Sequence, residues 1–130
     1  MYTVEEARAT LPTVQPILQE LSEATLEFNR LQDMVAALRK TVLADGNLVA
    51  DPWDATTEEE SPLARAQTTA RRCIEELEEL DIEVKDPAQG LIDFYHMRDG
   101  QVVYLCYLLG EPDILYWHTL DGGFAGRQPL

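Results

Sequence analysis

Apolar residues recur every third or fourth position from residue 14 to residue 42, which is the period of an amphipathic helix. One row is spaced by seven residues and a second row follows three residues behind it, as in a coiled-coil seam. The first row comprises Val14, Leu21, Phe28, Val35 and Val42, and the second comprises Ile17, Ala24, Leu31 and Leu38. Gly46 and Asn47 end the pattern, because both residues favour the left-handed conformation that follows a helix.

The residues before this pattern predict a separate short helix. Thr3 and Glu6 have the spacing of a capping box, in which each side chain satisfies the backbone amide of the other residue. Pro12 and Pro16 lack an amide donor and fit a first helical turn better than a helix interior. We therefore expect a short helix after Thr3 and a long helix that begins between the two prolines.

A second helix begins at Ser61-Pro62, a cap followed by a favoured first helical residue. Its apolar rows match those of the long helix, so the two helices should form an antiparallel hairpin. These rows are Leu63, Ala70 and Leu77, and Ala66, Cys73 and Leu80. Cys73 is interpreted as a small core residue. Residues 47–60, which include Trp53, form the predicted linker.

The second helix is shorter than the first, so it should cover mainly residues 28–42 of the long helix. Val14, Ile17 and Leu21 then need another cover, because an exposed apolar row of this length is unfavourable in water. The sheet predicted below, the short first helix or a second copy of the chain are the three alternatives. We expect a homodimer through this part of the seam.

The remaining residues predict a small antiparallel sheet. Three strands are expected at roughly 91–97, 101–109 and 114–119, and residues 82–87 form an extended link that is compatible with a short edge strand. Asp99-Gly100 is a strong two-residue hairpin signal that pairs Arg98 with Gln101. The predicted fold is α+β: one domain over residues 1–130, with a helical hairpin (1–81) packed on a three-stranded antiparallel sheet (82–130).

Counting outward from this hairpin places Asp93 opposite Cys106 on one face of the sheet. The register of the second turn has two solutions. A three-residue loop brings His118 to the same face, whereas a two- or four-residue loop turns His118 to the other face. In the first register Asp93, Cys106 and His118 form a cluster with Glu111 at its rim, and these oxygen, sulfur and nitrogen ligands suit Zn²⁺ or another divalent transition metal.

Ordinary core residues explain the same pattern equally simply. Cys106 lies in an apolar run where cysteine is commonly just buried, and Asp93 can pair with Arg127 or cap a turn. Arg127 has a planar fork that suits a carboxylate such as Asp93 or Asp121. A third interpretation makes Cys106 a nucleophile with His118 as its base, but no third orienting group is evident from the sequence.

Composition limits the classes of partner. The chain has 24 acidic and 10 basic residues and a formal net charge of −14. Nucleic acids and anionic membranes are disfavoured partners, because both are bound through Lys and Arg. The sequence shows no signal peptide and no apolar stretch that would span a bilayer. With only two cysteines, a disulfide framework is not expected, and we predict a cytoplasmic protein with reduced thiols.

Several short strings resemble a family of small bacterial proteins known as a domain of unknown function. They are Leu11-Pro12, Lys85-Asp86, Gly90-Leu-Ile-Asp-Phe94, Leu105-Cys106, Gly110-Glu111, Trp117-His118 and Gly123-Phe-Ala-Gly-Arg127. The resemblance extends over nearly the whole chain, although Tyr107 stands where it leads us to expect a Trp. It implies a bacterial protein of this architecture and supplies no activity, substrate or catalytic residue.

Two functional hypotheses follow from the sequence. The first is a non-catalytic interaction or regulatory module that self-associates. The second is a transition-metal-binding protein, as a hydrolase or a redox enzyme, that uses the cluster on the sheet. The glycine-rich segment from Gly122 to Gly126 lacks the Lys and the helix of a phosphate-binding loop. We expect it to be a tail that places Phe124 in the core.

Overall fold

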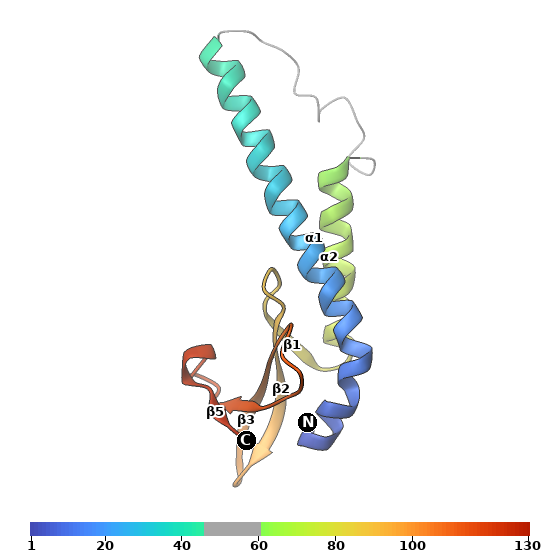
Figure 1. Cartoon of the computed structure of the whole chain (residues 1–130), viewed down its shortest axis with the longest axis vertical. Helices are drawn as coiled ribbons and strands as arrows, with labels where there is room; N and C mark the ends of the chain where they lie inside the picture. The colour runs from blue at the N-terminus through green and yellow to red at the C-terminus, as the bar shows by residue number, and fades with distance from the viewer. Residues whose placement is uncertain (46–60) are drawn as a thin grey trace.

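The computed structural model describes residues 1–45 and 61–130, which form two helices and a five-stranded antiparallel sheet (Figure 1). The α+β class is therefore confirmed. The helices are α1 (Val4–Asp45) and α2 (Pro62–Glu79). The predicted linker with Trp53, and the side chain of Val42 in the seam, lie outside what the structure describes.

Helix α1 is continuous from Val4 to Asp45, so the prediction of a separate first helix is wrong. The capping box is present: Glu6 N donates to Thr3 Oγ1 at 3.1 Å, and Thr3 N donates to Glu6 Oε1 at 3.2 Å. Pro12 and Pro16 lie inside the helix and are exposed. A proline has no N–H, so the carbonyl four residues before it has no donor within the helix. Both prolines lie on the solvent side, where water can donate to these carbonyls, and the opposite side of the helix packs in the core.

Helix α2 packs against a lower part of α1 than the sequence predicted. Its first turn lies beside Ala24 and Glu27, and its last residues reach the start of α1, where Tyr2 Oη donates to the carbonyl of Leu80. Its N-cap is Ser61, as expected, and Cys73 is fully buried. The far part of α1 projects past α2 in Figure 1. Leu38, predicted to lie in the seam, is therefore 43% exposed.

The sheet has the order β1-β2-β3-β4-β5. Its strands are β1 (Ile82–Asp86), β2 (Leu91–Arg98), β3 (Gln101–Leu108), β4 (Tyr116–His118) and β5 (Gln128–Pro129). Three strands were predicted, and the structure adds two edge strands, β1 and β5. Strand β1 is the extended link, whereas β5 is too short to give a periodic signal in the sequence.

The first hairpin has the predicted register. Arg98 pairs with Gln101, Tyr95 with Tyr104, and Asp93 with Cys106. Asp99 and Gly100 have φ values of 51° and 79°, as a two-residue turn of this kind requires. Local turn chemistry and the alternation of side chains were sufficient to place this pair of strands.

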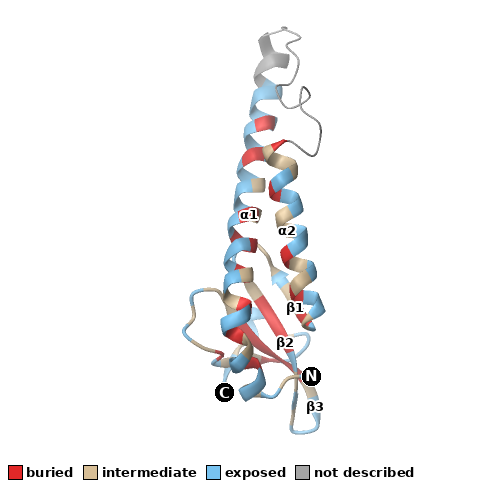
Figure 2. Ribbon diagram, turned by 90° about the vertical axis from the view of Figure 1, so that its right-hand side faces the viewer, coloured by how far each residue is buried: buried red, intermediate tan, exposed pale blue. Residues whose placement is uncertain are grey.

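One hydrophobic core joins the lower half of α1 to α2 and to one face of the sheet. Val14 and Leu21 are fully buried there, together with Cys73 and Leu77 of α2 and Phe94 and Leu105 of the sheet. Buried residues of the helices and of β2 face one another in Figure 2. Helix α2 and the sheet therefore cover Val14 and Leu21, and Ile17, the third residue of the expected dimer interface, is partly buried against the same core. Val14 and Leu21 are not available to a second chain, and homodimerisation stays a prediction without this interface.

Within the described residues, neither helix combines the length and the apolar character needed to span a membrane.

Candidate metal site

The second hairpin resolves the register that the sequence left open. Residues 109–115 connect β3 to β4, and His118 pairs with Tyr104 while Tyr116 pairs with Cys106. The shift relative to the predicted three-residue loop is two residues. Because side chains alternate with a period of two, His118 stays on the same face as Cys106.

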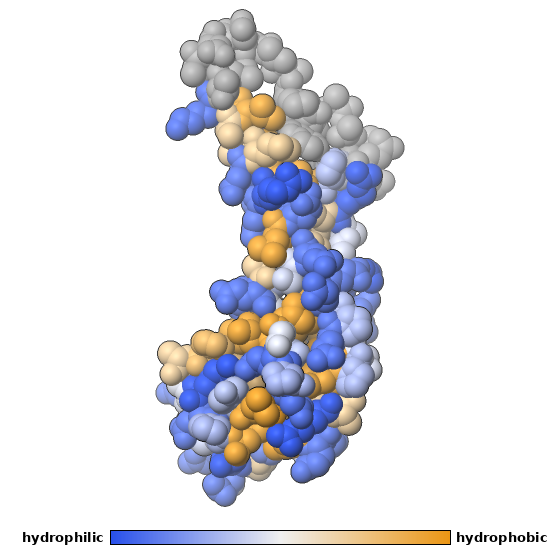
Figure 3. Space-filling view, in the orientation of Figure 1, coloured by the Kyte–Doolittle hydropathy of each residue, from blue (hydrophilic) through white to orange (hydrophobic). Residues whose placement is uncertain are grey.

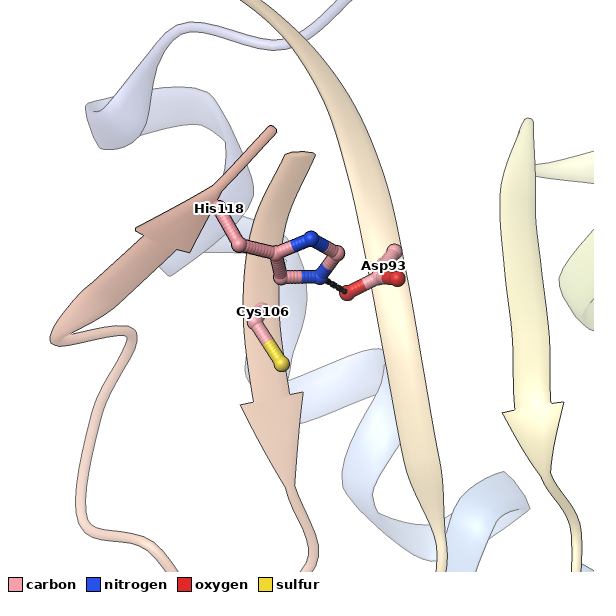
Figure 4. Close-up of side chains that lie close together, drawn as sticks. All are labelled: Asp93, Cys106 and His118. Atoms are coloured by element: carbon pink, nitrogen blue, oxygen red, sulfur yellow. Dashed lines mark hydrogen bonds and ion pairs between the residues drawn. The ribbon is translucent and has the colours of Figure 1, made fainter. Parts of the chain in front are cut away.

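This face is the one turned away from the helices. Ile92 and Phe94 of β2 pack in the core with α1, so Asp93 between them points to the opposite side. Figure 4 shows Asp93, Cys106 and His118 converging from three different strands. One ligand atom from each residue lies within 4.8 Å of the other two. All three residues are buried, with exposures of 1%, 1% and 2%.

Hydrogen bonds determine which nitrogen of His118 is available. Nδ1 lies 2.7 Å from the carbonyl oxygen of Thr119, and since a carbonyl only accepts, Nδ1 bears a proton and donates it. Nε2 lies 2.9 Å from Asp93 Oδ1. A histidine that ligates a metal usually donates its other ring N–H in this way, which fixes the ring and directs the second nitrogen at the ion.

Burial changes the acidity of the other two groups. It raises the pKa of Asp93, and the hydrogen bond and charge of His118 oppose that rise. Burial also raises the pKa of the Cys106 thiol to about 12, with the neighbouring Asp93 as the second cause. Cys106 is therefore a thiol in the free protein, and a metal ion must displace its proton.

The model of a family described as an uncharacterized conserved protein, DUF2203, matches residues 1–130. The chain belongs to the DUF2203 family. The resemblance to a family of unknown function is confirmed by this match. No curated protein and no solved structure matches the chain.

Glu111 of this DUF2203 chain does not join the cluster. Its Oε1 accepts from Leu108 N at 2.7 Å and from Arg127 Nη2 at 2.5 Å. Glu111, predicted at the rim of the cluster, is therefore not one of the converging donors, because its carboxylate is paired with Arg127. Arg127 was expected to pair with Asp93 or Asp121, and it pairs with Glu111 instead.

A second polar group borders the DUF2203 cluster and was missed by the sequence reasoning. Glu83 on β1 accepts from Tyr104 Oη at 2.7 Å, from Tyr95 Oη at 2.9 Å and from Lys85 Nζ at 2.7 Å. The ring of Tyr104 lies 5.3 Å from that of His118. Alternation alone places Tyr95 and Tyr104 on the face of Asp93, but only the pairing of β1 with β2 brings Glu83 to them.

The structure does not favour Cys106 as a nucleophile. A reactive cysteine needs a lowered pKa, whereas burial raises that of Cys106. His118 Nε2 is directed at Asp93 rather than committed to the thiol. The three residues of the DUF2203 cluster fit the donor set of a metal site better than they fit the arrangement of an activated thiol.

Proposed function

We propose that the protein binds a divalent transition metal, with zinc as the best match, through Asp93, Cys106 and His118. The observation that supports the proposal is the convergence of three buried donors of different chemistry within 4.8 Å. Imidazole nitrogen, thiolate and carboxylate are all established zinc ligands. A thiolate among the donors disfavours Mg²⁺ and Ca²⁺, which prefer oxygen ligands.

Charge balance favours a dication at this position. With Asp93 ionised, Cys106 deprotonated and His118 neutral, the two negative charges neutralise one divalent ion. A buried site is costly when it holds net charge, and this donor set leaves none. In the free protein the proton shared by Asp93 and His118, together with the thiol proton, occupies the positions that the metal would take.

Three protein ligands leave a fourth tetrahedral position for water or a small ligand. Structural zinc sites usually have four protein ligands, whereas three ligands and an open position are typical of sites that bind a further molecule. Because Glu111 is held by Arg127, we propose water as the fourth ligand in the resting protein. The identity of any molecule that replaces this water is a separate question from metal binding itself.

Elemental analysis of untagged protein, purified without chelator, tests the proposal directly. We expect one zinc or similar ion per chain. Protein stripped of metal should bind Co²⁺ with the thiolate charge-transfer absorbance and visible bands of a tetrahedral complex. Cys106→Ser and His118→Ala should each lose the charge-transfer band or the bound metal.

Cys73→Ser is the matched control, because Cys73 lies in the helical core and outside the cluster. This variant should retain metal in full. The proposal fails when the wild-type protein holds no metal and Co²⁺ or Zn²⁺ titration produces no change at Cys106. The three residues would then be a buried polar group of the fold.

Self-association is a second candidate, supported by exposed apolar residues on the half of α1 that is farther from the sheet. Leu26, Met34 and Leu38 are 55%, 38% and 43% exposed. Figure 3 shows apolar surface on this part of the molecule. The occupant that we propose is a second copy in antiparallel orientation, which would bring Arg39 and Lys40 of one chain toward Glu23 of the other.

Light scattering at micromolar concentration tests this second candidate. We expect twice the mass of the chain, and a return to the mass of one chain for Leu26→Glu combined with Leu38→Glu. A wild-type protein that scatters as a single chain over the whole range of concentration contradicts self-association and leaves the metal proposal unaffected.

A further inference from the structure

The residues that follow His118 lie against the metal cluster. We name residues 119–130 the C-terminal strap. It begins with Thr119, whose carbonyl accepts from His118, and it returns to the sheet as β5. There Gln128 pairs with Trp117 and Pro129 with Tyr116, and Leu130 N donates to the carbonyl of Leu115 at 3.0 Å. The strap therefore starts and ends beside β4.

Arg127 is the residue of the strap that reaches the cluster. Its Nη2 lies 2.5 Å from Glu111 Oε1 and 3.5 Å from the carbonyl oxygen of Cys106. The guanidinium lies over the rings of Tyr116 and Phe124, at 4.2 Å and 4.6 Å from their centroids. Phe124 was expected in the core, but it is 48% exposed and supports Arg127 instead.

The cluster is buried on the sheet face that the helices do not cover. Its three residues are nevertheless only 1–2% exposed, so other parts of the chain shield them on that face. The strap contacts two of them, through the Thr119 carbonyl at His118 and through Arg127 at the Cys106 carbonyl. Arg127 reaches the backbone of Cys106, with its Nη2 3.5 Å from that carbonyl oxygen. Burial raises the pKa of the Cys106 thiol, and the charge of Arg127 opposes that rise. On another side the Tyr104 ring lies against His118, with the Lys85 Nζ 4.5 Å from the Tyr104 centroid.

The strap itself is held by few contacts. Most of its residues are exposed, and its strand β5 has two residues. Segments with few buried apolar contacts open at lower free energy than the core does. The Arg127–Glu111 ion pair holds the strap to the β3–β4 connection and is largely buried, with side-chain exposures of 13% and 19%.

We propose that the C-terminal strap is the gate of the metal site and that the Arg127–Glu111 ion pair is its latch. The strap sets the rate at which a divalent ion enters and leaves the Asp93–Cys106–His118 cluster. A guanidinium beside Cys106 repels an approaching cation, so we expect Arg127 to move away with the strap before the ion passes. The inference rests on the proposed metal function for its ligand, but the opening of the strap can be measured without metal.

The first experiment measures access to Cys106 in full-length protein without metal. Cys73→Ser provides a parent in which Cys106 is the only thiol. Reaction with N-ethylmaleimide is followed by mass spectrometry in this parent and in the parent with Arg127→Ala. We expect Arg127→Ala to react roughly tenfold faster or more, because loss of a charge-assisted pair favours the open strap.

Arg8→Ala is the matched control. Arg8 also holds the β3–β4 connection, since its Nε and Nη2 both donate to the carbonyl of Ile114, but it extends from α1 and does not touch the strap. Glu111→Gln is the second latch variant, because it removes the charge while keeping an acceptor for Leu108 N. Urea unfolding of each variant separates opening of the strap from loss of global stability.

The strap hypothesis requires faster labelling in both latch variants, with the Arg8→Ala rate near that of the parent. Equal rates in parent and latch variants overturn it, as does an equal acceleration by Arg8→Ala. The second experiment measures release of Zn²⁺ to an excess of chelator, which should be faster by a similar factor in Arg127→Ala.

The two experiments separate the two proposals. Faster labelling of the latch variants in a protein that binds no metal shows that the strap controls access to Cys106, but it refutes the metal function and with it the role of the strap in metal exchange. Tight metal binding with unchanged labelling and unchanged release in the latch variants supports the metal function and refutes the gate.

Discussion

His118 Nε2 lies 2.9 Å from Asp93 Oδ1, although the two residues belong to strands that are not neighbours in the sheet. Strand β3 lies between β2 and β4, so the two side chains meet above it, beside Cys106. A pair that bridges two strand spacings needs both side chains to lean toward the middle strand. The pair therefore depends on the register of both hairpins at once.

The first prediction concerns this pair. Asp93→Asn replaces the carboxylate with an amide whose N–H can donate to His118 Nε2, so the free energy of unfolding should stay within about 1 kcal/mol of wild type. Asp93→Ala leaves Nε2 without a partner and opens a void, and should cost about 2–4 kcal/mol. Urea unfolding measures the free energy of unfolding of both variants. Equal values would show that the hydrogen bond to His118 does not stabilise the fold.

A second prediction uses three glycines as a graded series. Gly126→Ala should change the free energy of unfolding by less than about 0.5 kcal/mol, since its new Cβ meets open space. Gly100→Ala also meets open space but has a φ of +79°, and should cost about 1 kcal/mol. Gly90→Ala combines a φ of +74° with a Cβ only 2.7 Å from that of Leu109, and should cost about 3 kcal/mol. Thermal or urea unfolding that reverses this order contradicts the turn assignments.

The third prediction is a loss of stability in acid through Glu83. Hydrogen bonds from Lys85 and the two tyrosines lower the pKa of Glu83 to about 2. A lowered folded-state pKa stabilises the protein above the ordinary glutamate value and loses that contribution as the pH falls from about 4.5 toward 2. Glu83→Gln should flatten the pH dependence of the free energy of unfolding in this window. Tyr104→Phe, which removes one of the hydrogen bonds, should flatten it partly.

Two leucines of α1 give the fourth prediction. Leu21 is fully buried between α2 and the sheet, so Leu21→Glu should destabilise the fold by more than about 4 kcal/mol. Leu26 is 55% exposed, so Leu26→Glu should change the free energy of unfolding by less than about 1 kcal/mol. Circular dichroism during urea unfolding compares the two variants. A Leu21→Glu protein as stable as wild type would show that Leu21 does not lie in the core.

The fifth prediction is that the protein does not bind DNA or RNA at physiological salt. The net charge is −14, and Arg98 and Arg127 are the only Lys or Arg residues after residue 89. In the structure Arg98 lies over the ring of Trp117 and Arg127 is paired with Glu111. Fluorescence anisotropy of a labelled oligonucleotide should show no change at micromolar protein, and salt-sensitive binding would contradict the prediction.

The sequence by itself determined the parts of the fold that depend on local periodicity. The heptad rows gave two helices, and the Asp99-Gly100 turn gave the register that places Asp93 opposite Cys106. These features follow from interactions between residues that are close in the sequence, so no long-range contact was needed to predict them. The turn placed Asp93 and Cys106 on one sheet face, whereas the face of His118 stayed open between two registers until the structure decided it.

Only the tertiary structure decided how far helix α1 extends and where α2 lies along it. Pro12 and Pro16 disfavour a helix locally, but burial of Leu11, Val14 and Leu18 on the other side of α1 outweighs that cost. The second hairpin and the partner of Arg127 depend on residues 109–130, where turn signals allow several registers. The register in the structure brings His118 to Asp93 and pairs Arg127 with Glu111 in the same arrangement, and both contacts join residues that are far apart in the sequence.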